Sequence, residues 1–240
     1  MDVDPTWTFQ QYQIYEQKRL QESLAEQEVA REKGLVIDPK SEPHGGYRIA
    51  CVWPDEVTGP ACTVSAQVAA LLPGTPAYGY DSIHSSIGNI AAPGGRLVDP
   101  RQIPKDHELL DGLADAVKTA LRDLEGVATT TDRSTTFGPA LLAPRMALLF
   151  GRPAAGYWAL YRAVHMACAA QELQLVPSWG PHLTLTRFAA TARPGQVQSI
   201  LELLGSWQPV TAAPTSIMVG YYTVAPGEFS VDEYTSFDLR

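Results

Sequence analysis

The chain of 240 residues is long enough for one good-sized domain or two small ones, and 45% of it is hydrophobic, as in soluble globular proteins. A net charge of −8 argues against long duplex nucleic acid, which is bound through phosphate neutralisation by Lys and Arg, and fits a small nucleotide or a short oligonucleotide better. No apolar run approaches the roughly 20 residues of a membrane span, and the acidic N-terminus lacks the features of a secretory signal. The three cysteines form no C-x-x-C pair, so we expect unpaired, mostly buried thiols in a cytoplasmic protein without membrane contact.

Residues 9–33 are rich in good helix formers and are followed by Gly34, which predicts one long helix with a defined end. The apolar face of this helix is narrow and holds Tyr12, Tyr15, Leu20 and Leu24. Such a stripe would pack the helix on the body of the protein. We therefore expect an N-terminal helical arm and linker over residues 1–43 and a main domain over residues 44–240. Whether the arm also makes an oligomer or partner contact is left open.

The main domain mixes strand-like and helix-like segments. Strand-like patterns occur at residues 47–53, 78–90, 137–142, 146–150, 182–188, 216–222 and 234–239. Helical spacing occurs at residues 106–124 and 154–174 and from Pro194 to Gly205, whereas residues 61–72 fit either a strand or a helix. Because the elements do not alternate strictly, we expect an α+β domain in which helices flank mostly antiparallel sheets.

Two of the five histidines lie in predicted strands and precede a hydroxyl side chain by two residues: His84 with Ser86, and His182 with Thr184. Because strand side chains alternate between faces, each histidine shares a face with its hydroxyl partner, about 6–7 Å along the strand. Two such matches among five histidines arise by chance about one time in eight, so the pattern needs support from its context.

The other histidines lack this pattern. We expect His44 in a loop, His107 at the N-terminal end of a helix and His165 on another helix, near the core of the protein. No H-E-x-x-H motif, run of Asp and His ligands or set of cysteines is present, so no metal and no other cofactor is predicted. A G-x-S-x-G nucleophile turn is also absent.

The segments His84-Ser85-Ser86-Ile87 and Pro181-His182-Leu183-Thr184-Leu185 resemble the paired H-x-[ST]-hydrophobic signature of the two-histidine (2H) phosphoesterase superfamily. This superfamily includes 2′-5′ RNA ligase-like enzymes and cyclic nucleotide phosphodiesterases. The resemblance covers about residues 47–240 and is closer at the second motif, because Ser86 replaces the more usual threonine at the first. It implies a bilobal, pseudo-twofold fold with antiparallel sheets around a central groove and flanking helices. The N-terminal helix has no counterpart in the minimal family fold.

The resemblance implies a metal-independent phosphodiesterase that hydrolyses a cyclic phosphate or a 2′-5′ phosphodiester in a nucleotide or short oligonucleotide. His84 and His182 would be the acid–base pair, because imidazoles with a pKa near about 6.5 serve both roles at neutral pH. Ser86 and Thr184 would bind phosphate oxygens. Which histidine is the acid is left open. The alternative is a non-catalytic nucleotide-binding or interaction module on the same fold.

Substrate contacts outside the motifs are predicted from residue type. Aromatic side chains near strand ends could stack on a base. The first candidates are Tyr80 and Trp179, and Tyr78 and Phe137 are further candidates. Candidate cations for a second phosphate are Arg145, Arg152 and Arg187. The competing interpretation of each of these residues is edge packing or a solvated surface position.

Overall fold

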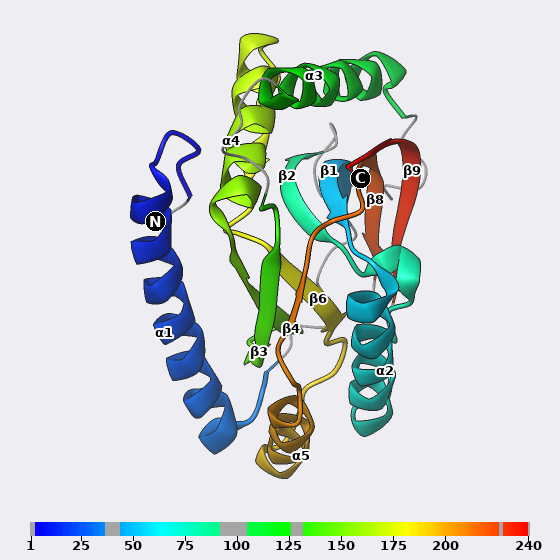
Figure 1. Cartoon of the computed structure of the whole chain (residues 1–240). Coiled ribbons are helices and arrows are strands. Elements are labelled where there is room, and N and C mark those ends of the chain that lie inside the picture. The colour runs from blue at the N-terminus through cyan, green and yellow to red at the C-terminus, as the bar shows by residue number, and fades with distance from the viewer. Residues whose placement is uncertain (1–2, 37–43, 92–104, 126–131, 226–227, 240) are drawn as a thin grey trace.

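The computed structural model describes residues 3–36, 44–91, 105–125, 132–225 and 228–239. Its strands form two antiparallel sheets (Figure 1). The first sheet has the order β5 (Val176–Pro177), β2 (Ser85–Ala91), β1 (His44–Val52), β8 (Ser216–Ala225) and β9 (Glu228–Asp238). The second has the order β6 (His182–Arg187), β4 (Met146–Pro153), β3 (Thr135–Ala143) and β7 (Val210–Ala212). Each sheet holds one histidine motif.

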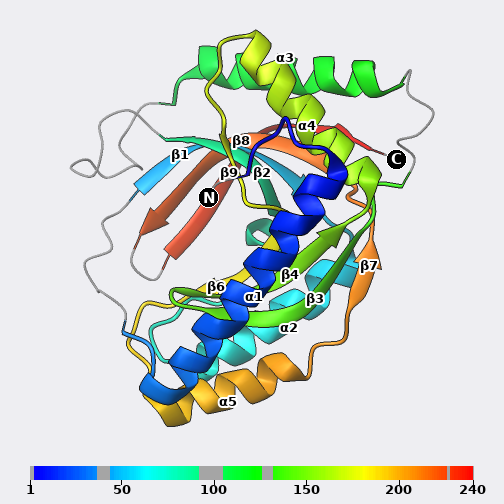
Figure 2. The same ribbon diagram turned by 90° about the vertical axis from the view of Figure 1, so that its left-hand side faces the viewer.

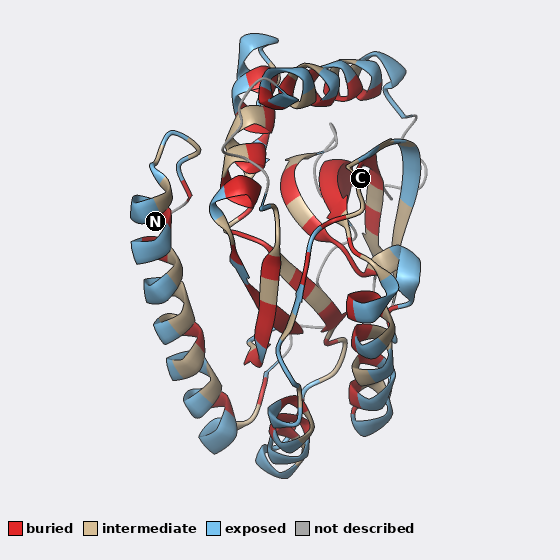
Figure 3. Ribbon diagram, in the orientation of Figure 1, coloured by how far each residue is buried: buried red, intermediate tan, exposed pale blue. Residues whose placement is uncertain are grey.

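The helices are divided between the two sheets. Helices α3 (His107–Glu125) and α4 (Ala155–Ala170) pack on each other and on the first sheet, whereas α2 (Asp55–Leu71) and α5 (Pro194–Gly205) pack on the second. Figure 2 shows α1 (Phe9–Lys33) lying along β3 and β4. Buried residues line the strands and the inward faces of the helices (Figure 3). The expected α+β fold with two antiparallel lobes is confirmed.

Helix α1 has the predicted bounds, and its burial explains how it is held. A capping box between Thr8 and Gln11 starts the helix, and Gly34 ends it at a φ of 78°. Tyr12 and Tyr15 are buried, as the narrow apolar stripe predicted. Helix α1 therefore packs on the main domain through the face that holds Tyr12 and Tyr15. The predicted linker over residues 37–43 lies outside the described residues.

The structure settles one open alternative in the secondary structure and corrects one expectation. Residues 61–71 of the ambiguous segment belong to helix α2, because Val57, Ala61 and Val68 recur at helical spacing and are all buried. The strand expected over residues 78–90 is shorter: a 3₁₀ turn, η1 (Tyr80–Ser82), comes first, and β2 begins at Ser85. The N–H groups of Ser82 and Ile83 bond back to the Gly79 carbonyl, so the chain turns there instead of extending. His84 therefore lies directly before its strand.

The remaining local expectations can be checked briefly. His165 is buried and His107 begins α3, as predicted, but His44 begins β1 rather than lying in a loop. The three cysteines are unpaired, and Cys51 and Cys168 are buried. No helix in the described part of the chain combines the length and the apolar character needed to cross a membrane.

Candidate active site

The two histidine motifs share an irregularity that the sequence pattern alone does not reveal. The ladder between β1 and β2 skips Ile87, and the ladder between β4 and β6 skips Leu185, so the fourth residue of each motif forms a β-bulge. Both side chains are fully buried. Because bulges change the direction of neighbouring side chains, the two motifs are anchored in the core in the same way, one in each sheet. This is direct structural support for the pseudo-twofold relation.

The first bulge is held by the surrounding elements. The Ile87 carbonyl accepts a hydrogen bond from the Ser178 N–H and lies 3.1 Å from Nε2 of His165. Next to it, Gly88 leaves no room for a side chain, because a Cβ would come within 2.5 Å of Leu175 Cγ. The glycine that follows the first motif is therefore required by the close approach of β5.

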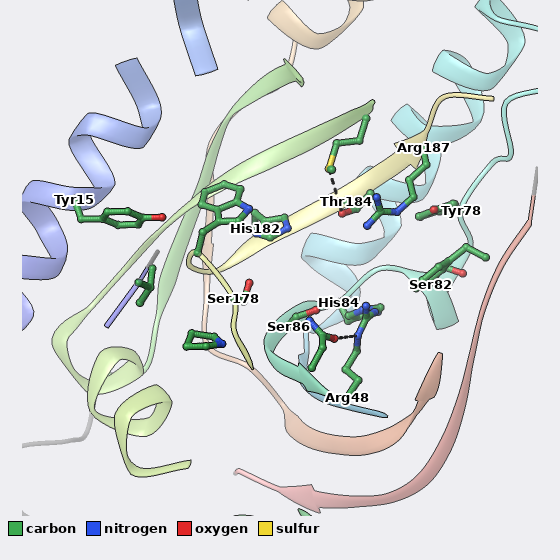
Figure 4. Close-up of a pocket in the computed structure, with 16 residues that line it drawn as sticks. Tyr15, Arg48, Tyr78, Ser82, His84, Ser86, Ser178, His182, Thr184 and Arg187 are labelled. Carbon is green, nitrogen blue, oxygen red and sulfur yellow. Dashed lines mark hydrogen bonds between the residues drawn. The ribbon is translucent and has the colours of Figure 1, made fainter. Parts of the chain in front are cut away.

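The two motifs line one cavity of about 330 Å³. His84 and Ser86 come from the first motif, and His182 and Thr184 come from the second (Figure 4). Trp179, shortly before the second motif, also lines the cavity. Residues 98 positions apart in the sequence thus meet around a space within the usual range for a small-ligand site.

His182 is oriented on two sides. Its ring stacks on Trp179, with the centroids 4.2 Å apart and the planes 6° apart, and its Nδ1 lies 3.1 Å from the Gly180 carbonyl. Nδ1–H therefore donates to this carbonyl, which directs Nε2 to the cavity. The Tyr12 hydroxyl of helix α1 lies against Gly180, where the backbone has a φ of 140°. The N-terminal arm thus supports the turn that positions His182.

His84 is 8% exposed and lies between aromatic and cationic side chains. The Phe229 ring is 5.9 Å from its own ring, centroid to centroid, and Nη1 of Arg48 contacts its Nε2. Arg48 is held in turn by a 2.8 Å hydrogen bond from its Nε to Oδ1 of Asn89. Both Arg48 and Asn89 line the cavity.

The pKa values of both histidines lie below the ordinary value of 6.5. Burial lowers the pKa of His84 well below this value, and Arg48 and His182 lower it further. Burial also lowers the pKa of His182 to about 4, although the hydrogen bond to Gly180 opposes the change. Both imidazoles are therefore neutral at pH 7. An anion bound between them would raise both pKa values.

The two hydroxyl groups are available to a ligand. The Ser86 hydroxyl makes no hydrogen bond to a residue that the structure describes. Thr184 has only a weak contact, 3.9 Å from its Oγ1 to the thioether sulfur of Met146. Two donors without strong partners among the described residues, placed beside two imidazoles, suit the non-bridging oxygens of a phosphate group.

The charge of the cavity lining is positive. Arg48 and Arg187 line it, whereas no Asp or Glu does so among the described residues. Nε of Arg187 is buried without a hydrogen-bond partner in the described part of the chain. The Tyr78 hydroxyl is buried near Arg187, and burial raises its pKa to about 12, so it stays a neutral donor. The lining is complementary to an anion.

Only some of the predicted substrate contacts line the cavity. Trp179 lines the cavity, but His182 covers one face of its ring and the Arg19 guanidinium lies 5.7 Å from its centroid. Tyr80 is 56% exposed and lies outside this cavity, in a neighbouring one of about 270 Å³ that His84 also lines. Arg187 lines the main cavity, whereas Arg145 and Arg152 do not.

Some cavity residues were not predicted from the sequence. Val3 and Tyr15 reach the cavity from the N-terminal arm, and Phe229 reaches it from β9. Arg48 had a usable signal, because it interrupts the otherwise apolar run at residues 47–53 and a charged residue is rarely buried without a reason. No group of three or more His, Cys, Asp or Glu side chains among the described residues could hold a metal ion.

The comparisons with known proteins agree with this architecture. No protein-family model and no curated protein matches the chain. A solved phosphoesterase structure is 16% identical with a TM-score of 0.51, over 82% of this chain and 99% of that one. The structure of TT0787 of Thermus thermophilus is 17% identical with a TM-score of 0.50, over 82% of this chain and 98% of that one. E. coli LigT complexed with ATP is 16% identical with a TM-score of 0.48, over 82% and 99% respectively.

At these identities the likeness establishes the fold. The predicted α+β fold, with one motif in each of two antiparallel sheets, is shared with a solved phosphoesterase. About 82% of the chain takes part in this likeness.

Proposed function

We propose that the chain is a metal-independent phosphodiesterase of the 2H phosphoesterase superfamily that hydrolyses a cyclic phosphate or a 2′-5′ phosphodiester in a nucleotide or short oligonucleotide. The observation that carries this proposal is the single cavity lined by both histidines and both motif hydroxyls. The chain shares its fold with a solved phosphoesterase. The volume of the cavity suits a small ligand, and the cavity lining is cationic.

The chemistry follows from the four motif residues. One imidazole takes a proton from water, whose oxygen attacks phosphorus. The other imidazole gives its proton to the leaving oxygen as the phosphorus–oxygen bond breaks. Ser86 and Thr184 donate hydrogen bonds to the non-bridging oxygens as their charge grows. Arg187, at the end of β6, adds positive charge to the same cavity.

Turnover tests this function. The purified chain is assayed against 2′,3′-cyclic nucleotides and 2′-5′-linked and cyclic oligonucleotides, with His84→Ala and His182→Ala as the test variants. His107→Ala is the matched control, because His107 lies at the start of α3 and does not line the cavity. Each test substitution should lower kcat about 10²–10⁴-fold, whereas the control and chelators should have no effect.

Three outcomes would overturn the proposal. Full activity in either test variant would remove that histidine from the mechanism. Activity that depends on added metal would contradict the metal-independent chemistry. Calorimetric binding of nucleotides without turnover across the panel would favour a non-catalytic nucleotide-binding module.

A further inference from the structure

Arg48 is a cation buried in the wall of the cavity. It lies in the middle of β1, is 6% exposed, and its guanidinium is 4.2 Å from the ring centroid of Tyr222 and 5.5 Å from that of Phe229. Among the described residues it forms no ion pair with an acidic side chain. Burial lowers its pKa to about 10, so it is still charged at pH 7. Such a charge is costly unless an anion meets it, and the cavity is where an anion would do so.

The contact between Arg48 and His84 determines the form of the imidazole. A guanidinium has only donors, so Nη1 of Arg48 requires a lone pair on Nε2 of His84. His84 is then neutral and carries its proton on Nδ1, a buried atom without a hydrogen-bond partner among the described residues. The cavity thus holds His84 in the form that a general base needs.

His182 is in a different environment. Its Nδ1–H donates to the Gly180 carbonyl, and this bond favours the protonated ring. No arginine is in hydrogen-bond contact with it in the described part of the chain, and Arg187 and Arg48 act on it only through longer-range charge. The two histidines, equivalent in the motif, are therefore unequal in their surroundings.

We propose that Arg48 divides the catalytic roles: it keeps His84 as the general base, leaves the role of general acid to His182, and binds the substrate phosphate. This inference rests on the proposed function. When the phosphate arrives, its oxygens draw the guanidinium away from Nε2 of His84 and water takes that place. His84 removes a proton from the water, and the oxygen bonds to phosphorus. Because the bound anion raises the pKa of His182, its Nε2 takes up a proton from solvent before the reaction. The leaving oxygen keeps the electron pair of the broken bond and takes this proton. Both rings then exchange one proton with solvent.

The groups around His84 support this assignment. On the cavity side His84 faces Arg48 of β1, Arg187 and His182 of β6, and Tyr78. On the side of the neighbouring cavity the charged groups are Asp55 of α2, Asp81 of η1 and Glu233 of β9. The cations dominate the effect on its pKa, because Arg48 is in direct contact with the ring.

A change of leaving group tests the assignment of roles. A nucleoside 3′-(p-nitrophenyl phosphate) needs no general acid, because p-nitrophenolate leaves without a proton. His182→Ala should therefore retain activity within about tenfold of wild type on this ester while losing about 10²–10⁴-fold on a 2′,3′-cyclic nucleotide. His84→Ala should lose activity on both substrates. If His84→Ala retains activity on the p-nitrophenyl ester and His182→Ala does not, the roles are reversed, and the inference fails while the proposed function stands. If wild type hydrolyses neither substrate, the proposed function itself fails.

The pH profile of kcat/KM tests the part played by Arg48. In Arg48→Met the limb that rises with pH, which reports the base, should move up by about one pH unit, because the cation no longer opposes protonation of His84. The falling limb should move much less, and KM should rise. Arg122→Met on α3, away from the cavity, controls for the loss of one positive charge. Movement of the falling limb instead would overturn the inference.

A direct measurement covers the case in which Arg48→Met does not fold. Nitrogen-15 NMR of the histidine rings in the wild-type protein without ligand should show His84 at pH 7 as the tautomer protonated on Nδ1. Addition of inorganic phosphate should perturb the His84 signals. A His84 ring protonated on Nε2 would contradict the proposal.

Discussion

The buried ring of His165 gives the most quantitative prediction about stability. Burial lowers its pKa from 6.5 to about 4, so the folded state binds fewer protons than the unfolded state between these pH values. The stability that the neutral ring contributes is present above pH 6.5 and is lost as the pH falls towards 4. Linkage with these two pKa values gives a loss of about 2 kcal/mol between pH 7 and pH 5.

The substitution His165→Gln separates this titration from the hydrogen bond to the Ile87 carbonyl, because glutamine keeps a donor and does not titrate. Urea unfolding of both proteins is measured at pH 7, 6 and 5. The variant should be less stable at pH 7, and the difference should shrink by about 2 kcal/mol at pH 5. Parallel stability curves for the two proteins would refute the reasoning.

Three further predictions concern the residues around the cavity. Gly180→Ala should lower the stability of the fold by about 1–3 kcal/mol in thermal unfolding, because of the φ of 140° and the added contact with the Tyr12 hydroxyl. Adding Tyr12→Phe to this variant should restore the stability lost to the steric contact but not the stability lost to backbone strain. No recovery in the double variant would contradict the contact. Thr184→Val should lower kcat about 10²–10³-fold in steady-state kinetics and Thr184→Ser should restore most of it, whereas an unchanged kcat would remove the hydroxyl from phosphate binding. Burial raises the pKa of Glu16 to about 7, so its carboxyl costs stability as the pH rises from 4.5 to 7, and Glu16→Gln should stabilise the protein by up to about 3 kcal/mol in denaturant unfolding at pH 8. Equal stability of the two proteins at pH 8 would refute that pKa.

The sequence predicted the elements that carry strong local signals. The long helix over residues 9–33 and the helix from Pro194 to Gly205 were predicted with their true ends, because caps and breakers mark both of them. Strands β3 and β4 were predicted from the apolar runs at residues 137–142 and 146–150, and the structure pairs them as antiparallel neighbours. Local chemistry determines these elements, so they can be identified without tertiary contacts.

Tertiary contacts determine the features that were missed. The short strand β5 exists because residues 176–177 pair with Gly88 and Asn89, and nothing in Val176 or Pro177 indicates a strand. The start of β2 depends on pairing with β1, so the turn that precedes it could not be placed from the strand-like pattern.

The site was predictable in its motifs and not in its surroundings. His84, Ser86, His182 and Thr184 meet around one cavity, as the paired pattern indicated. Arg48, by contrast, comes from a strand 36 residues before His84, and only the sheet brings the two together. The spacing of residues along the sequence does not reveal which strands pair, so the contact between Arg48 and His84 could not be predicted.

The central claim is that His84 and His182 act on one phosphodiester in one transition state, and a double-mutant cycle tests it most directly. kcat for the best cyclic-phosphate substrate is measured in wild type, His84→Ala, His182→Ala and the double variant. Residues that act as a unit are strongly non-additive, so the double variant should be about as slow as the slower single variant. Losses that multiply would show that the two histidines act independently and would contradict a shared site.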